Sequence, residues 1–108
     1  MNISELVAES TRIAREKGWG EERTFGDLIA LMHSELSEAL EEFREGHFLD
    51  EVYFDNEGKP QGIPIELVDC IIRIAHFCGE ADIDLDRAIA TKMKYNEGRP
   101  NRHGGKVI

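Results

Sequence analysis

The stretch PIELVDCIIRIAHFCG, residues 64–79, decides the fold of this 108-residue chain. At about 100° per residue, its apolar side chains cover most of the circumference of a helix. Such a helix is expected at the centre of a fold, with Pro64 at its first position and Gly79 at its end. Four side chains interrupt the apolar surface and share one narrow stripe: Glu66, Asp69, Arg73 and His76.

This stripe places charge on a helix that the rest of the chain is expected to cover. Buried charge is costly unless it is paired or bound to a metal ion. One interpretation is a structural network in which Arg73 bridges Glu66 and Asp69. The other is a metal site, and residues 64–79 alone do not choose between the two.

The preceding helix, predicted over about residues 25–45, favours the metal site. Glu35, Glu38 and Glu42 share one side of this helix, and spacings of three and four residues point their carboxylates the same way. Antiparallel packing would bring acidic pairs of the two helices face to face, and converging carboxylates require cations. Ligands that are all oxygens suit Mg²⁺ or Mn²⁺ rather than zinc or copper. The candidate ligands are Glu35, Glu38, Glu66 and Asp69.

Three further segments complete the predicted architecture. A first helix is expected over about residues 3–17, with Asn2 and Glu5 forming a capping box. Residues 47–62 break the helical period and indicate an extended piece and a turn, long enough for a lid or an assembly element. A last helix is expected over about residues 84–96, with these side chains facing inward: Leu85, Ala88, Ile89 and Met93.

These segments predict an all-α fold with one domain over residues 1–108. Four helices form a bundle-like arrangement with a long loop between the second and the third. The hydrophobic fraction of 41% permits a core of modest depth, so assembly into a homo-oligomer through an exposed helix face is expected. Cys70 and Cys78 are too far apart on one helix for a mutual disulfide, so both are expected to be reduced and buried.

The charge of the chain limits its partners. The formal net charge is −9, which argues against duplex nucleic acid, because that partner requires a broad basic face. Residues 92–108 are the exception, with five basic side chains against one acidic one. No apolar run reaches the length of a membrane span, and no export signal is recognisable. A cytoplasmic protein without a membrane partner is therefore expected.

The two acidic pairs resemble a known family. Glu35-Leu-Ser-Glu38, followed after 27 residues by Glu66-Leu-Val-Asp69, is similar to the ExxE…ExxD signature of the MazG-like, all-α nucleoside triphosphate pyrophosphohydrolases. Residues 58–69 and the ending 92–100, followed by His103-Gly-Gly-Lys106 after two further residues, also look like members of this family.

The resemblance implies a reaction and roles for residues. Members form helical homodimers or homotetramers with sites near subunit contacts, and cleave (deoxy)nucleoside triphosphates between the α and β phosphates. Nucleotide-pool house-cleaning is the role expected from the family. The four acidic residues named above would be the Mg²⁺ ligands. Lys92, Asn96 and Arg99 would contact the phosphates, and Trp19 would either line the base pocket or cap the core.

One departure from the family concerns the general base. Many relatives have a glutamate where this chain has Ser34, so no base carries over from that position. Glu42 or a metal-bound hydroxide would serve instead. His76 is interpreted either as a structural histidine or as a supporting or weak metal ligand, and Arg73 as a residue that steadies the ligand carboxylates.

Three alternative functions remain open at this point. A non-catalytic helical module that binds a partner protein would use its carboxylates only for solubility. A phosphotransfer domain would carry a reactive histidine at His76, although it has no need of paired carboxylates. Phosphoribosyl-ATP pyrophosphohydrolase is a third alternative within the same superfamily.

Overall fold

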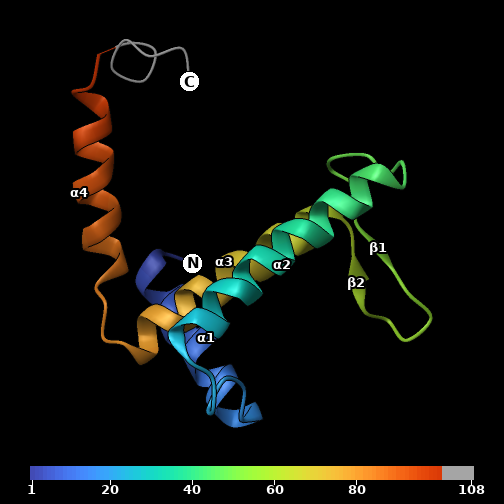
Figure 1. Cartoon of the computed structure of the whole chain (residues 1–108), viewed down its shortest axis with the longest axis horizontal. Coiled ribbons are helices and arrows are strands. Elements are labelled where there is room, and N and C mark those ends of the chain that lie inside the picture. Colours follow the sequence, from blue (N-terminus) through green and yellow to red (C-terminus); the bar gives the residue numbers. More distant parts are fainter. Residues whose placement is uncertain (101–108) are drawn as a thin grey trace.

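The computed structural model describes residues 1–100, which form four helices and one short β-hairpin (Figure 1). The helices confirm the all-α prediction, and Arg102, His103 and Lys106 lie outside the described residues. The elements in chain order are α1 (Ile3–Lys17), α2 (Phe25–Arg44), β1 (Tyr53–Phe54), β2 (Pro60–Gln61), α3 (Ile63–Glu80) and α4 (Leu85–Glu97).

Helix α1 begins at its predicted capping box, whereas α3 extends one residue beyond each predicted end, from Ile63 to Glu80. The Asn2 side chain accepts a hydrogen bond from the Glu5 amide at 2.8 Å, and the Glu5 carboxylate accepts one from the Asn2 amide at 3.3 Å. Thr24 and Asp27 form the equivalent capping box at the start of α2. Gly18 ends α1 with φ of 70°, a left-handed conformation that costs glycine little.

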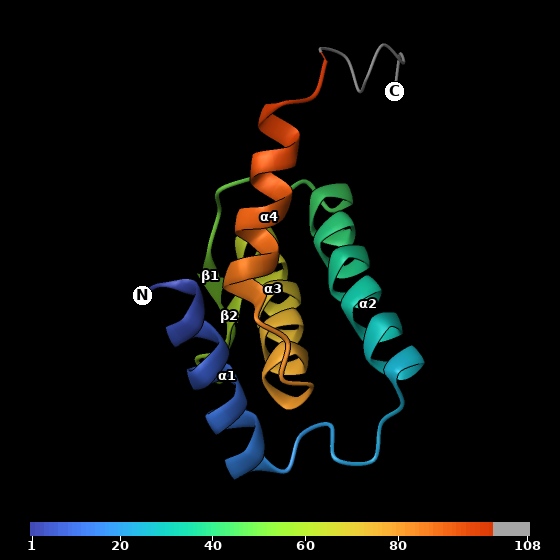
Figure 2. The same cartoon turned by 90° about the vertical axis from the view of Figure 1, so that its left-hand side faces the viewer.

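Helix α3 lies between α1 and α2, as expected for the most apolar segment (Figure 2). It runs antiparallel to α2 (Figure 1). Gly79 allows α1 to approach closely, because a Cβ atom there would overlap the Thr11 side chain. Cys70 and Cys78 are buried free thiols, which confirms their prediction. The buried apolar residues are mostly small: Ala14, Ala39, Ile63, Cys70, Ala75 and Cys78.

The loop between α2 and α3 forms a β-hairpin. Its strands pair antiparallel, with Tyr53 opposite Gln61 and Phe54 opposite Pro60. The Asp55 carboxylate closes the turn by accepting hydrogen bonds from two backbone amides, at 2.8 and 2.9 Å. The first strand matches the predicted extended piece, whereas the sequence analysis did not anticipate the second. The hairpin lies at the end of the α2–α3 pair that is remote from α4 (Figure 1).

Helix α4 projects from the other three and corrects one prediction. It contains no buried residue, and its main contacts with the rest of the chain are to α1. Ile89 and Met93 are 39% and 62% exposed, Ala88 is also exposed, and Leu85 is half-buried. The expectation that these side chains face inward is wrong for the single chain. Three helices, α1 to α3, form its core, and the apolar side of α4 is only partly covered within residues 1–100.

Candidate metal centre

Three carboxylates converge where α2 crosses the first half of α3. Glu35 and Glu38 lie one turn apart on α2, and Glu66 lies in the first turn of α3. Each offers an oxygen within 4.8 Å of the oxygens of the other two. Glu35 and Glu66 are only 7% and 8% exposed, whereas Glu38 is open to solvent. The antiparallel packing predicted from the sequence therefore brings these three ligands together.

Arg73 holds this group from the α3 side. Its Nε donates to Glu35 Oε1 at 2.9 Å. The structural interpretation from the sequence paired Arg73 with Glu66 and Asp69 on its own helix, but the arginine reaches across to α2 instead. Arg73 therefore forms an interhelical ion pair with one of the candidate ligand carboxylates.

The pKa values of Glu66 and Glu35 indicate that one arginine does not neutralise all the carboxylates of the group. Burial, followed by the nearness of Glu38, raises the pKa of Glu66 to about 8. Burial also acts to raise the pKa of Glu35, but the hydrogen bond from Arg73 and the contact with Glu38 outweigh it and lower that pKa. One arginine thus keeps Glu35 ionised, while Glu66 retains a proton at neutral pH unless a cation replaces that proton.

Asp69 lies beside the group without joining its tight cluster. It is half-buried one turn after Glu66. Burial raises its pKa, the negative charge of Glu35 adds to the effect, and Arg73 and Lys59 oppose it. Lys59, on the hairpin, is a charged neighbour that the sequence analysis did not single out, because nothing in the helical pattern relates it to Asp69.

The donor set fits a hard divalent cation. All candidate ligand atoms are carboxylate oxygens, and buried carboxylates in mutual contact are stabilised by Mg²⁺ or Mn²⁺. Because the pKa of Glu66 is raised, a bound cation would compete with a proton for this carboxylate. The residues that would hold the ion are Glu35, Glu38, Glu66 and Asp69.

Glu42 lies outside this group, in a second cluster at the C-terminal end of α2. The Tyr53 hydroxyl lies 2.9 Å from both of its carboxylate oxygens, and His47 Nε2 lies 3.3 Å from Oε2. The His47 ring stacks on Tyr53, and its Nδ1 lies 3.2 Å from Glu51. Glu42 therefore attaches the hairpin to α2. Sequence reasoning missed Tyr53 and His47 because residues in an irregular loop carry no periodic signal.

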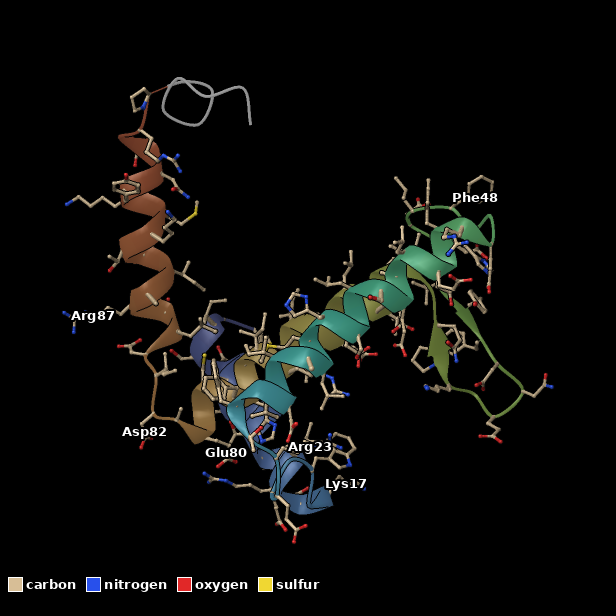
Figure 3. The ribbon with its side chains drawn as sticks, in the orientation of Figure 1. Lys17, Arg23, Phe48, Glu80, Asp82 and Arg87 are labelled. Carbon is tan, nitrogen blue, oxygen red and sulfur yellow. The ribbon has the colours of Figure 1, made fainter. Side chains whose placement is uncertain are left out.

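His76 lies near the other end of α3, and Trp19 lies in the loop that follows α1. His76 Nε2 is 3.4 Å from Glu80, which also binds Arg15 of α1, and Figure 3 labels Glu80 at this end of the helix. Gly20 in the α1–α2 loop leaves room for the His76 ring. Trp19 is 59% exposed, so the expectation that it caps the core is wrong. His76 is not one of the residues that form the carboxylate group.

The predicted phosphate-binding residues all lie on α4 or directly after it. Lys92 Nζ and Arg99 Cζ lie 4.8 and 5.7 Å from the centre of the Tyr95 ring, so this ring gathers both cations on one side of the helix. Asn96 is one turn after Lys92 and is exposed. Helix α4 departs from the end of α3 that is remote from the hairpin, away from the carboxylate group (Figure 1). The single chain therefore does not unite these residues with the acidic ligands.

The chain matches no protein-family model, no curated protein and no solved structure. Within residues 1–100, every helix is too short or too polar to cross a bilayer.

Proposed function

We propose that this chain hydrolyses nucleoside triphosphates between the α and β phosphates, with Mg²⁺ or Mn²⁺ as cofactor, in the manner of the MazG-like family. The observation that carries the proposal is the convergence of Glu35, Glu38 and Glu66 from two helices. Asp69 and the pairing of Arg73 with Glu35 support it. If these carboxylates served only to stabilise the fold, we would expect more basic side chains than Arg73 alone to neutralise them.

Each acidic side chain would have a different role in binding the cation. Arg73 fixes the rotamer of Glu35 and keeps it ionised, so that this ligand is ready before a cation arrives. Glu66 would give up its proton to a bound cation, and Glu38, which is exposed, would remain accessible to a substrate from solvent. Once bound, a divalent cation would neutralise phosphate oxygens and make water a better nucleophile.

Basic side chains would bind the phosphates that leave as pyrophosphate. Lys92 and Arg99 supply charge, and Asn96 supplies an amide donor on the same side of α4. Glu42 is a weak choice for the general base, because it already binds Tyr53 and lies beside His47. This arrangement favours the carboxylate group and its cation as the place where water is activated.

A panel of (d)NTPs with and without Mg²⁺ tests the proposal. Monophosphate and pyrophosphate are expected from at least one nucleotide, with loss of turnover in EDTA. Glu66→Gln is expected to lower kcat by at least about 100-fold, because it removes a buried ligand. Glu41→Gln is the matched control, an exposed glutamate on α2 whose ion pair within residues 1–100 is with Arg44. Inorganic phosphate as the only product would contradict the cleavage position, and no turnover of any nucleotide would contradict the function.

A second function, the non-catalytic protein-interaction module, is favoured by one observation. Large apolar side chains on α2, α3 and the hairpin loop are exposed, including Phe43 at 57% and Phe48 at 77%. This function predicts that Glu66→Gln stabilises the chain and leaves partner binding intact. The pyrophosphohydrolase proposal predicts that the same substitution abolishes Mg²⁺ binding, so titration calorimetry with Mg²⁺ separates the two.

A further inference from the structure

We infer that Lys59, on the β-hairpin, binds the phosphate chain of the nucleotide beside the carboxylate group of the same chain. Its unpaired charge, the fixed position of its backbone and its nearness to Asp69 support this role. A part in turnover rests on the proposed function, whereas binding of a phosphate chain can be measured by itself.

Lys59 carries an unpaired positive charge in the part of the chain that holds the carboxylates. Residues 25–80 contain thirteen acidic side chains against three lysine or arginine side chains. Arg73 and Arg44 each form an ion pair with a glutamate of α2. Lys59 is exposed and forms no ion pair within residues 1–100. Its ammonium group is therefore available to an anion from solvent.

The backbone of Lys59 is held in the turn of the hairpin. Its amide donates to Asp55 Oδ1 at 2.9 Å, and its carbonyl accepts a hydrogen bond from the Asp55 amide at 3.0 Å. Both oxygens of the Asp55 carboxylate accept from amides, Oδ1 also from the Glu57 backbone and Oδ2 from the Gln61 side chain. This carboxylate therefore fixes the backbone of Lys59 without forming an ion pair with its ammonium group.

The hairpin is itself attached to both helices that supply the carboxylate group. The Tyr53 hydroxyl donates to Glu42, which lies about one turn after Glu38 on α2. Strand β2 contacts α3 and leads directly into the first turn of that helix, which contains Glu66. Figure 3 shows the hairpin at the end of the α2–α3 pair where Phe48 is labelled. The side chain of Lys59 therefore starts from a fixed position at the carboxylate end of this pair.

The charge of Lys59 acts on Asp69, one of the candidate ligands. Burial raises the pKa of Asp69 and the charge of Glu35 adds to this effect, whereas Arg73 and Lys59 oppose it. Lys59 is thus close enough to influence a carboxylate of the site. A lysine side chain is a compact charge on a flexible four-carbon stem, so it can turn from a carboxylate to a phosphate without movement of the backbone.

A triphosphate at this site requires positive charge in addition to the metal ion. Its phosphate chain is negative and would lie against several carboxylates. In the metal-free chain, Lys59 partly neutralises Asp69. Its ammonium group becomes available to a phosphate oxygen once that carboxylate binds the cation. Lys92 and Arg99 lie on or after α4, away from the carboxylate group, whereas Lys59 is already beside it (Figure 1).

Lys59→Ala tests this role, because it is expected to change two affinities in opposite directions. In titration calorimetry with inorganic triphosphate and Mg²⁺, its Kd should rise at least about 10-fold, since a charged contact to phosphate is lost. Mg²⁺ alone should bind more tightly than to wild type, because a positive charge near Asp69 is removed. Lys59→Arg should keep both affinities within about threefold of wild type. Lys17→Ala is the matched control, an exposed lysine at the end of α1 that Figure 3 labels far from the hairpin.

The outcomes separate this role from the proposed function. Equal triphosphate affinity in Lys59→Ala and wild type, or no triphosphate binding by wild type, would overturn the role of Lys59. Weaker binding of both Mg²⁺ and triphosphate would also overturn it, since a purely structural residue predicts that result. Wild type that binds triphosphate through Lys59 but cleaves no nucleotide would contradict the proposed function and leave the phosphate site supported. With an active wild type, Lys59→Ala should raise KM at least about 10-fold and change kcat by less than about threefold.

Discussion

At the scale of single residues, the balance of charge around Glu66 bears on the stability of the fold and on the proposed metal binding. Two other glutamates lie in its immediate neighbourhood, and the arginine of the group binds Glu35 instead. Burial and Glu38 therefore raise the pKa of Glu66 to about 8. A carboxyl that is buried with a proton stabilises the fold only while it keeps that proton or exchanges it for a cation.

The stability of the metal-free protein is expected to fall as pH rises. The folded pKa of Glu66 lies above its ordinary value of 4.5, so its stabilising contribution is complete below about pH 4.5 and is lost towards about pH 8. Between about pH 5.5 and about pH 9 the melting temperature should drop by at least about 5 °C. Thermal melts in EDTA measure this drop.

The control for this prediction is Glu66→Gln, an uncharged residue of the same shape. The drop should largely disappear in this variant, and millimolar Mg²⁺ should restore wild-type stability at high pH without affecting the variant. An equal pH dependence in wild type and variant would show that another group binds the proton.

The sequence predicts this group only in part. The three- and four-residue spacings place acidic side chains on facing sides of two helices, so Glu35, Glu38 and Glu66 follow from the pattern. The partner of Arg73 cannot be predicted from the sequence pattern, because the shift of α2 along α3 decides whether Arg73 meets Glu35 or Glu66. The spacing of residues along one helix contains no information about that shift.

At the scale of elements, the β-hairpin is attached to α2 by polar contacts in place of a core. The Tyr53 hydroxyl donates to Glu42, and burial followed by this hydrogen bond raises the pKa of Tyr53 to about 12. His47 stacks on the same ring, between Glu42 and Glu51. These contacts could not be predicted from residues 47–62, since their pattern has neither a helical nor a strand period.

Tyr53→Phe is expected to loosen the hairpin and leave the helices intact. Loss of one hydrogen bond to a carboxylate should cost about 1–2 kcal/mol. Backbone amides of residues 53–61 should therefore exchange with deuterium faster, while those of α3 keep their protection. Tyr95→Phe is the matched control, because Tyr95 is exposed and its hydroxyl has no partner within residues 1–100. Unchanged exchange in the Tyr53 variant would show that stacking alone attaches the hairpin.

Gly62 fixes the junction between the hairpin and α3. Its φ is 125°, and a Cβ atom there would overlap the backbone carbonyl of Glu51. Gly62→Ala is expected to lower the free energy of unfolding by about 3 kcal/mol or more, because the overlapping atoms belong to backbone that cannot turn aside.

Gly58→Ala isolates the effect of backbone conformation in this comparison. Gly58 also has a positive φ, of 80°, but nothing lies within 4 Å of the added Cβ atom. Its substitution should cost only about 1–2 kcal/mol. Urea unfolding measures both variants, and equal losses would contradict the close approach at Gly62.

At the scale of the whole molecule, acidic and basic residues are segregated into different parts of the chain. The core carries the carboxylates, and α4 carries cations on the side that also bears its apolar stripe. The sequence indicates that Leu85, Ile89 and Met93 require an apolar surface to pack against, and we therefore expected them to face the core of the same chain. An amphipathic stripe does not state whether that surface belongs to the same chain, and in this structure Ile89 and Met93 remain 39% and 62% exposed.

A chain that ends at Asp84 tests what α4 contributes to the fold and to assembly. Because α4 contributes no buried residue, the shortened chain should keep the helical circular dichroism of α1 to α3 and still unfold cooperatively. Its free energy of unfolding at low protein concentration should change by less than about 1 kcal/mol. At high concentration it should remain monomeric by light scattering, because it lacks the exposed apolar side chains of α4, a helix face through which the expected homo-oligomer would assemble. Loss of helix content would show that the contacts of α4 with α1 hold the core together, and a persistent oligomer would place the contact between copies on another surface.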